Sequence, residues 1–454
     1  MLSMPYAGCG WSGLRPSLQD CASGCAAVLL RLFLALTTDM TEDEFRAACD
    51  PDVLACAAQR CRRGVDWKGS VIKWMHYSPR NCLKLSQDLL SGKYRLQDYL
   101  VFKINDPKPR TIFATRYRDR VVQRALLDNG LFYALSKSFI SSNFACQPEK
   151  GLTAATCWLN VHLQKFWKEQ GKSNEGWYVQ LDVRHYFDST PHRLLKERVS
   201  RRVESESAKR IIYEVIDSFK DTRPQAEIDA DPFGERGIAL GSHLSQLLQL
   251  LYLDGFDHFV KERLRVKHYV RYMDDMLMLL PTKEEAWKVY HAAEAELAKL
   301  GLQLNPKSKV GKISAGIRFL KVVHRLTPSG GIRRRAAMKS WRKQEHRTRV
   351  ILKKLEGAQD EEEKLALQEE LRKSVASWTG YAKWRASREQ KRMMLKMLEG
   401  HLPEKKKLEP KEPAEKKKLG RGKFTEEQWD VIDEQSVDES WIFEDDDRPQ
   451  LVVV

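Results

Sequence analysis

The chain has 454 residues, enough for two or three subdomains around a sizeable hydrophobic core. With 78 Lys and Arg against 62 Asp and Glu, its formal net charge is +16, which favours a polyanionic partner without determining a fold. None of its nine cysteines forms a Cys-x-x-Cys pair. This argues against a disulfide framework or a zinc site and favours reduced thiols in a cytoplasmic protein.

Residues 1–39 are predicted to be an extension of uncertain role. Their apolar run from Cys25 to Thr38 is too short to span a bilayer, and we expect no membrane partner. Either Met40 is the true start, or this segment forms a peripheral helix. Helices are expected over residues 40–99, where Thr41 and Glu44 have the spacing of a capping box.

Two strands, Val101–Ile104 and Thr111–Ala114, are predicted on either side of a turn. Lys108 and Arg110 at that turn could hold a triphosphate, because these cations bind phosphate oxygens, although a solvated basic surface explains them equally well. Lys150 precedes a helix expected to start near residue 153, and a helix N-terminus suits a phosphate backbone. A simple surface loop is an equally plausible interpretation there.

A half-buried strand from Trp177 ends at the carboxylate of Asp182 and continues into an aromatic turn that contains Phe187. A helix over roughly 196–219 and a loop over 221–235 are expected next. Then Gly237 and Gly241 open an apolar helix whose leucines have core spacing. On its opposite face, polar side chains are expected to contact substrate, namely Ser242, Ser245, Gln246 and Gln249.

The stretch HYVRYMDDMLMLL, residues 268–280, predicts two strands joined by a tight turn that presents Asp274 and Asp275. Adjacent carboxylates are costly to bury unless a cation neutralises them, which favours a magnesium site. Taken alone, an Asp-Asp turn is more often merely solvated. Asp182 would complete a cluster of three carboxylates, the kind that holds two metal ions for in-line attack at phosphorus.

Beyond this hairpin, an amphipathic helix ending at Gly301 precedes a turn with Lys307 and Lys309 and then a pair of strands. Residues 332–399 are predicted to be helical, basic and interleaved with tryptophans, as expected of a surface that follows a nucleic-acid backbone. Aromatic residues in helices are also common in cores. From residue 403 onward, low apolar content and alternating charge blocks predict disorder.

In their order along the chain, these segments resemble a reverse transcriptase over roughly residues 66–387. LDVRHYFDS and YMDD are similar to the catalytic blocks, and ALGSHLSQ is similar to the block between them. LNPKSK and IRFLK resemble the lysine and primer-grip blocks, and DPKPRTI and FACQPEKGLTAA resemble the fingers blocks. The resemblance implies an α+β right-hand polymerase with a helical N-terminal region (40–99), fingers (100–175), a palm with an antiparallel sheet (176–331), a helical basic thumb (332–400) and a charged tail (401–454).

The resemblance also implies the roles of individual residues in an RNA-directed DNA polymerase. Two Mg²⁺ ions, or Mn²⁺, would be held by Asp182, Val183, Asp274 and Asp275. The nucleotide would contact Lys108, Arg110, Phe187, Gln246, Lys307 and Lys309, with Phe187 excluding a ribose 2′-hydroxyl and either Lys307 or Lys309 protonating the pyrophosphate. The template and primer would contact Lys150, Gly241, Ser245, Tyr272 and Phe319.

Within the family, the Gly-x-x-x-Ser-Gln form at residues 241–246 is similar to diversity-generating retroelements, which copy a template RNA with errors at adenines. The chain departs from that branch at Leu240, Gln147 and Lys321. Expected partners are template RNA, a primer–cDNA duplex, dNTPs and a small basic accessory protein. The alternatives are a retron, group II-like or phage-defence enzyme, an RNA-dependent RNA polymerase, and a non-catalytic RNA-binding scaffold.

Overall fold

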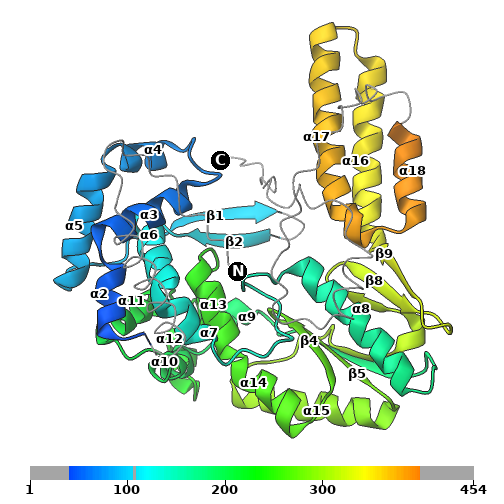
Figure 1. Cartoon of the computed structure of the whole chain (residues 1–454), viewed down its shortest axis with the longest axis horizontal. Helices are drawn as coiled ribbons and strands as arrows, with labels where there is room; N and C mark the ends of the chain where they lie inside the picture. Colours follow the sequence, from blue (N-terminus) through cyan, green and yellow to red (C-terminus); the bar gives the residue numbers. More distant parts are fainter. Residues whose placement is uncertain (1–39, 106–108, 399–454) are drawn as a thin grey trace, which may run out of the picture. The chain divides into compact units, whose positions relative to one another are not determined.

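The computed structural model describes residues 40–105 and 109–398 (Figure 1). The contacts within the chain divide it into two compact units. Among the described residues, the first unit comprises 40–105, 109–155 and 176–311, and the second comprises 156–175 and 312–398.

The first unit opens with four helices, and side chains cap the first two of them. Thr41 caps the first helix, and the Glu44 carboxylate accepts a hydrogen bond of 2.8 Å from the Thr41 backbone amide, as predicted. Asp50 caps the second, which has Pro51 in its first turn. These helices are α2 (Glu42–Ala48), α3 (Pro51–Arg62), α4 (Gly69–His76) and α5 (Ser78–Leu90).

A two-stranded ribbon follows, formed by β1 (Leu100–Asn105) and β2 (Pro109–Ala114), as the sequence predicts. Residues 106–108, which the sequence predicts to form a turn, lie outside the described residues. The chain then enters α6 (Tyr117–Leu126), a π-helical segment (Leu127–Leu131) and α7 (Phe132–Ser136).

The central sheet of this unit has the strand order β4-β5-β3-β6. Its strands are β3 (Trp177–Leu181), β4 (His268–Tyr272), β5 (Asp275–Leu280) and β6 (Lys309–Lys312). β5 pairs antiparallel with both β3 and β4, and its residues from Met276 to Leu280 are buried on both faces because helices pack against the sheet. α15 (Lys283–Lys299) contacts β3 and ends before Gly301, as predicted.

The remaining helices of the first unit correct two predictions. Residues 196–219 form two helices, α10 (His192–Ser200) and α11 (Glu206–Asp217), because the Ser205 hydroxyl accepts a hydrogen bond from the Ala208 amide and starts a new helix. The expected loop at 221–235 contains a short helix, α12 (Gln225–Ala230). The other helices are α9 (Tyr186–Ser189), α13 (His243–Tyr252), α14 (Asp254–His258) and a π-helical segment (Phe259–Arg263).

The second unit consists of part of α8 (Leu152–Glu169), a three-stranded antiparallel sheet and a helical group. The strands, in the order β7-β8-β9, are β7 (Ile317–Phe319), β8 (Val322–Leu326) and β9 (Ile332–Ala336). The helices are α16 (Met338–Gly357), α17 (Glu361–Arg385) and α18 (Arg388–Leu398). The prediction that helical structure begins at residue 332 is therefore wrong, because residues 332–336 complete the sheet.

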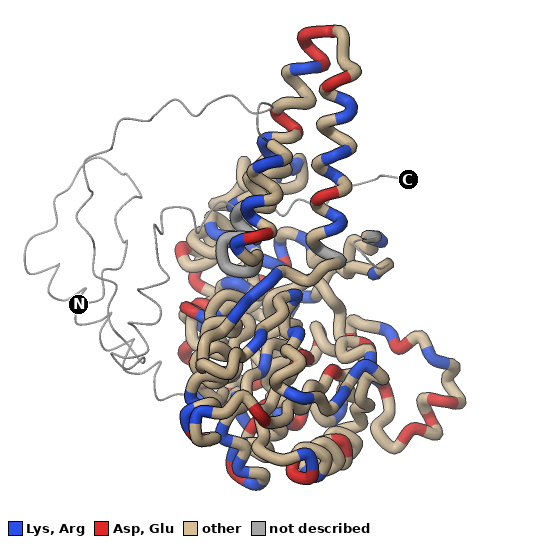
Figure 2. Tube along the Cα trace, turned by 90° about the vertical axis from the view of Figure 1, so that its right-hand side faces the viewer, with Lys and Arg blue, Asp and Glu red and all other residues tan. Residues whose placement is uncertain are grey.

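The helical group of the second unit has its own hydrophobic core. Trp341 and Trp378 are buried, and their ring centroids lie 5.7 Å apart in an edge-on arrangement. These two tryptophans pack inside the helical group, so the expectation that they follow a nucleic-acid backbone is wrong. Charged residues of both signs occur along α16 and α17 (Figure 2), and Arg347 lies 3.8 Å from Glu370 across the pair.

The predicted α+β class is confirmed, since helices and antiparallel sheets occur in both units. The boundaries proposed for fingers, palm and thumb stay predictions. Among residues 40–105 and 109–398, none of the helices is both long enough and apolar enough to cross a membrane.

Candidate metal-binding active site

The β4–β5 hairpin presents the paired aspartates through a turn of two residues. Tyr272 pairs with Asp275 across the hairpin, so Met273 and Asp274 form the turn, and Asp275 is the first residue of β5. Met273 has a φ of 55°, a left-handed conformation that is unfavourable for a residue with a side chain. The predicted hairpin is therefore confirmed, with one strained residue immediately before Asp274.

The three predicted carboxylates are coupled to one another. Burial, together with the charge of Asp182, raises the pKa of Asp274 to about 6, and the two side chains are within hydrogen-bond contact. Burial, followed by the charges of Asp274 and Asp182, raises the pKa of Asp275 to about 7. Carboxylates that are crowded and desolvated in this way are stabilised in their ionised form by a cation.

The backbone around Asp182 is fixed by the segment at residues 303–308. The Asp182 amide lies 3.1 Å from the Ser308 hydroxyl oxygen, and its carbonyl accepts a hydrogen bond of 2.7 Å from the Asn305 amide. The next residue, Val183, forms an isolated antiparallel bridge with Leu304. The hydrogen bonds of this bridge are made by the neighbouring residues, Asp182 with Asn305 and Arg184 with Gln303. In such a pair the Val183 carbonyl points away from Leu304 and makes no hydrogen bond to it.

A buried ion pair, Arg271 with Asp257, is hydrogen-bonded to the turn that carries Asp274. Arg271 and Asp257 are both fully buried, and the guanidinium makes contacts of 2.6–2.9 Å with both carboxylate oxygens. Although burial alone lowers it, the pKa of Arg271 is raised by the adjacent Asp257 charge, so the pair is ionised. Nη1 of Arg271 also donates a hydrogen bond of 3.0 Å to the carbonyl of Met273, the strained residue in the turn.

This pair was not among the predicted site residues, although the sequence carries a signal for it. Arg271 interrupts an apolar strand, and a buried guanidinium requires a carboxylate partner. Asp257 lies in an apolar helical stretch and also accepts a hydrogen bond of 2.7 Å from the Tyr269 hydroxyl. Ser308, between the two predicted lysines, was missed as well.

Two of the predicted nucleotide-binding residues lie in this part of the first unit. Arg110, on β2, is exposed and close enough to Asp274 for its charge to lower the pKa of that carboxyl group. Phe187 is half-buried on α9, and its carbonyl accepts a hydrogen bond of 2.8 Å from the Ile238 amide. Lys108 lies outside the described residues.

Gly241 has a structural reason to be glycine. Its φ is 148°, and a Cβ atom at this position would lie 2.6 Å from the carbonyl oxygen of Phe113 on β2. The adjacent Leu240 carbonyl accepts a hydrogen bond of 3.0 Å from the Phe113 amide. Gly241 therefore lets β2 pack directly on the segment that leads into α13. Gly241 itself is exposed, and its contact with template or primer stays a prediction.

The polar face predicted for α13 is only partly correct. Ser245 and Gln249 are fully buried, and the Ser245 hydroxyl lies 2.7 Å from that of Ser242. The expectation that Ser245 touches template is therefore wrong, because its hydroxyl is buried against that of Ser242, the N-cap residue of α13. Gln246 is half-buried, and its Oε1 lies 3.1 Å from the thiol sulfur of Cys146.

The predicted lysines differ in their surroundings. Lys150 donates hydrogen bonds to the carbonyls of Ser141 and Asn143, so it stabilises its own loop. Lys307 and Lys309 are exposed on either side of Ser308, and Lys309 is the first residue of β6 rather than part of the turn.

The predicted primer contact Phe319 lies in the second unit, on β7, and is fully buried. It is a core residue of that sheet, so the expectation of a direct contact with primer is wrong.

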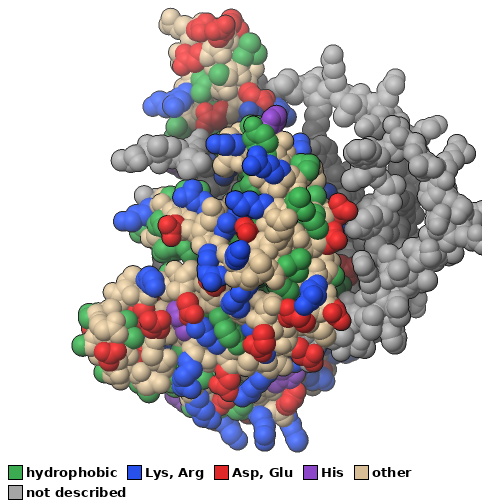
Figure 3. Space-filling model, turned by 90° about the vertical axis from the view of Figure 1, so that its left-hand side faces the viewer, with side chains coloured by type: hydrophobic (Ala, Val, Ile, Leu, Met, Phe, Trp, Pro, Cys, Tyr) green, Lys and Arg blue, Asp and Glu red, His purple; other side chains and the backbone are tan. Residues whose placement is uncertain are grey.

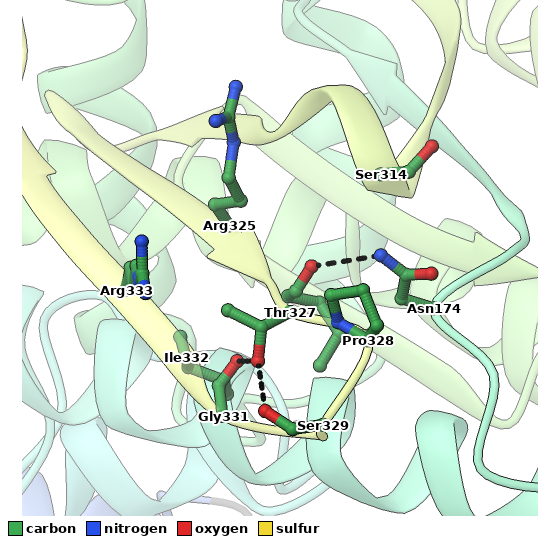
Figure 4. Close-up of a pocket in the computed structure, with 10 residues that line it drawn as sticks. Asn174, Ser314, Arg325, Thr327, Pro328, Ser329, Gly331, Ile332 and Arg333 are labelled. Atoms are coloured by element: carbon green, nitrogen blue, oxygen red, sulfur yellow. Dashed lines mark hydrogen bonds between the residues drawn. The ribbon is translucent and has the colours of Figure 1, made fainter.

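Figure 4 shows a pocket in the second unit, near the tip of the β8–β9 hairpin. Arg325 and Arg333, which are cross-strand partners, line it together with polar side chains such as Asn174. None of the three carboxylates belongs to this unit.

The chemistry of the donor set fits a divalent cation. Asp182, Asp274 and Asp275 offer hard oxygen ligands, and the Val183 carbonyl points away from its bridge partner. Raised carboxyl pKa values indicate a local excess of negative charge and little water, conditions that a metal ion relieves.

Comparison with known proteins adds independent information. Residues 103–323 match the family model described as reverse transcriptase (RNA-dependent DNA polymerase), so this region is a reverse transcriptase domain. Protein YkfC of Escherichia coli (strain K12) is 27% identical over 185 residues, which are 39% of this chain and 45% of that protein. The chain thus spans less than half the length of this relative.

Two telomerase structures also show similarity to the chain. Apo telomerase from Candida tropicalis, truncated from the C-terminal domain, has a TM-score of 0.36 and 14% identity, covering 57% of this chain and 60% of that one. Telomerase from Candida albicans, in complex with a TWJ fragment of telomeric RNA, has the same TM-score and identity, covering 53% and 46%.

Proposed function

We propose that this chain, which contains a reverse transcriptase domain, is an RNA-directed DNA polymerase whose active site is formed by Asp182, Asp274 and Asp275. One observation carries the proposal. The three carboxylates lie at the ends of two neighbouring strands, are half-buried and are electrostatically coupled. A cluster of this kind has no evident structural purpose without a cation, because it raises the free energy of the folded protein whenever the groups ionise.

The reaction is attack of a primer 3′-hydroxyl on the α-phosphate of a dNTP, which forms a phosphodiester bond and releases pyrophosphate. Two Mg²⁺ ions, or Mn²⁺, held by the carboxylates and the Val183 carbonyl, would activate the hydroxyl and neutralise charge on the leaving group. The protein's own contribution is positioning. Ser308 and Asn305 hold the backbone of Asp182.

The nucleotide would be gripped from the β1–β2 ribbon and selected by an aromatic side chain. Arg110 is exposed and within electrostatic reach of Asp274, so a triphosphate bound near the carboxylates would lie near its guanidinium. Phe187 would exclude a ribose 2′-hydroxyl, which argues against an RNA-dependent RNA polymerase. Lys307 or Lys309, both exposed beside Ser308, would protonate the pyrophosphate.

Template RNA and a primer–cDNA duplex would bind along basic surfaces of the chain. The face turned to the viewer in Figure 3 carries Lys and Arg interspersed with Asp and Glu. Contacts with phosphates are therefore expected to be distributed, and binding should weaken with increasing salt.

Primer extension on an RNA template tests the activity. Asp274→Asn and Asp275→Asn should each reduce extension to background while RNA binding, measured by filter retention, is unchanged. Asp229→Asn is the matched control, because Asp229 is exposed on α12. Full extension by either active-site variant would refute the assignment of the metal ligands.

For the subfamily, we propose a diversity-generating retroelement enzyme that miscopies adenines and works with a small basic accessory protein. The support is the Gly-x-x-x-Ser-Gln form at residues 241–246, together with the half-buried position of Gln246. Sequencing cDNA made on a template of mixed bases is the test. Errors concentrated opposite adenines support this proposal, whereas equal error rates at all four bases favour a retron, group II-like or phage-defence enzyme.

A further inference from the structure

Away from the three aspartates, a second group of metal-binding side chains lies where α10, α11 and the segment before Gly237 meet. It consists of His192, the first residue of α10, Asp217, the last residue of α11, and Glu235. One ligand atom from each of the three lies within 4.8 Å of the other two. α10 and α11 contact each other in the first unit (Figure 1).

The orientation of the His192 ring is fixed by backbone contacts. Its Nε2 lies 2.6 Å from the carbonyl oxygen of Gly237, and since a carbonyl only accepts, Nε2 must carry the hydrogen. The His192 amide also donates a hydrogen bond of 2.9 Å to the carbonyl of Glu235. In the neutral ring, Nδ1 is therefore the atom with the free lone pair.

That lone pair faces two oxygen atoms that cannot donate to it. Nδ1 of His192 is 3.5 Å from Oδ1 of Asp217 and 3.5 Å from Oε2 of Glu235. His192 is only 4% exposed, and Nδ1 is buried without a hydrogen-bond partner. All three converging atoms are acceptors when the ring is neutral, so no hydrogen bond joins Nδ1 to either carboxylate.

A proton on Nδ1 fits this geometry less well than a metal ion does. A distance of 3.5 Å is longer than an N–H···O hydrogen bond, which is usually about 2.7–3.2 Å. Ligands bound at about 2.0–2.2 Å in a tetrahedral zinc site are roughly 3.3–3.6 Å from one another. Lys196, whose Nζ is 2.6 Å from Oδ1 of Asp217, neutralises that carboxylate. It does not neutralise the Glu235 carboxylate, whose Oε2 also faces Nδ1 of His192.

We propose that His192, Asp217 and Glu235 form a structural site for a divalent transition-metal ion of the zinc class, separate from the site at the three aspartates. An imidazole nitrogen with two carboxylates suits Zn²⁺ rather than Mg²⁺, which prefers oxygen ligands alone. Donation from Nε2 to a carbonyl is the usual arrangement that orients a metal-binding histidine. The site uses no cysteine, so the absence of Cys-x-x-Cys pairs does not argue against it.

Zinc bound here would join the two helices to the segment that leads into α13. Glu235 stands two residues before Gly237, whose amide donates a hydrogen bond of 2.8 Å to the Thr190 carbonyl. Ile238, the next residue, donates to the carbonyl of Phe187. The ion would therefore stabilise the connection between α9, α10 and α13.

Zinc binding to the full-length chain, measured by equilibrium dialysis in excess Mg²⁺, tests this proposal. The excess Mg²⁺ keeps zinc out of the site at the three aspartates. Any zinc bound by cysteine thiols is the same in all variants, so it cancels when they are compared. The unaltered protein should bind one more Zn²⁺ than His192→Gln, and Glu235→Gln should bind it about tenfold or more weakly. Glu227→Gln, which removes an exposed carboxylate on α12, should bind like the unaltered protein.

A thermal unfolding series gives a second readout. Added Zn²⁺ should raise the unfolding midpoint of the unaltered protein and of Glu227→Gln, but not that of His192→Gln or Glu235→Gln. Because the Glu235 side chain is 63% exposed, its replacement tests a ligand without disturbing the core. Equal zinc stoichiometry and affinity in Glu235→Gln and Glu227→Gln would overturn the proposal.

Discussion

Replacing Arg271 by methionine removes the cation that both balances Asp257 and holds the Met273 carbonyl. Both members of the pair are fully buried, so the substitution leaves an isolated carboxylate in the core. Breaking a buried ion pair from one side costs about 3–5 kcal/mol of folding free energy. Urea denaturation followed by circular dichroism should show a loss of this size, and the exposed-site control Arg263→Met should show almost none.

A second variant separates stability from positioning. In Arg271→Met/Asp257→Leu the unpaired carboxylate is gone, but the buried Tyr269 hydroxyl loses its acceptor, which costs about 1–3 kcal/mol. The double variant should therefore be more stable than Arg271→Met by about 2 kcal/mol. Its Met273 carbonyl still lacks the guanidinium donor.

Primer extension should consequently remain impaired in the double variant. A hydrogen bond from a charged donor is worth about 1.5–3 kcal/mol, so kcat should fall about 10- to 150-fold in both variants, with a higher Mg²⁺ requirement. Recovery of kcat together with stability in the double variant would show that Arg271 acts only through folding. An unchanged urea midpoint in Arg271→Met would refute the reasoning about burial.

Three further predictions follow from the same site. Because the carboxyl pKa values of Asp274 and Asp275 are raised by burial to about 6 and about 7, their contribution to stability is fully present below pH 4 and is lost as pH rises to 7. Urea midpoints without metal should fall over this range, Mg²⁺ should restore them most at high pH, and a flat profile would contradict the coupling. Phe187→Ala should admit ribonucleotides in primer extension, and unchanged sugar selectivity would remove its proposed role. Gly241→Ala should lower the urea midpoint more than Gly64→Ala, which shares the positive φ but has open space around it, and equal losses would show that the close approach of β2 is unimportant.

Local patterns determined the parts of this protein that depend on neighbours in sequence. The capping box at Thr41 and the β4–β5 hairpin were predicted correctly, because caps and tight turns involve residues a few positions apart. The association of Asp182 with Asp274 was also predictable. A strand that ends in a carboxylate, followed later by an Asp-Asp turn, places both at one edge if the strands are adjacent, and β3 and β5 are.

Only the tertiary structure decided which polar or aromatic side chains face solvent. Ser245, Phe319 and Trp341 were expected to contact nucleic acid, yet each is buried, because the face of an element that is covered depends on what packs against it. A sequence pattern gives the period of a helix or strand, but not the identity of its neighbours.

The same limit applies to pairs that are distant in the chain. The position of Arg271 in an apolar strand predicts a buried carboxylate partner, but only the fold identifies that partner as Asp257. His192 and Glu235 are 43 positions apart, and a short backbone bridge brings them together. The sequence alone thus identified the carboxylates at the hairpin and at the strand end as one cluster. The packing of distant segments decided what supports them, because contact energies depend on distances in space that chain spacing does not specify.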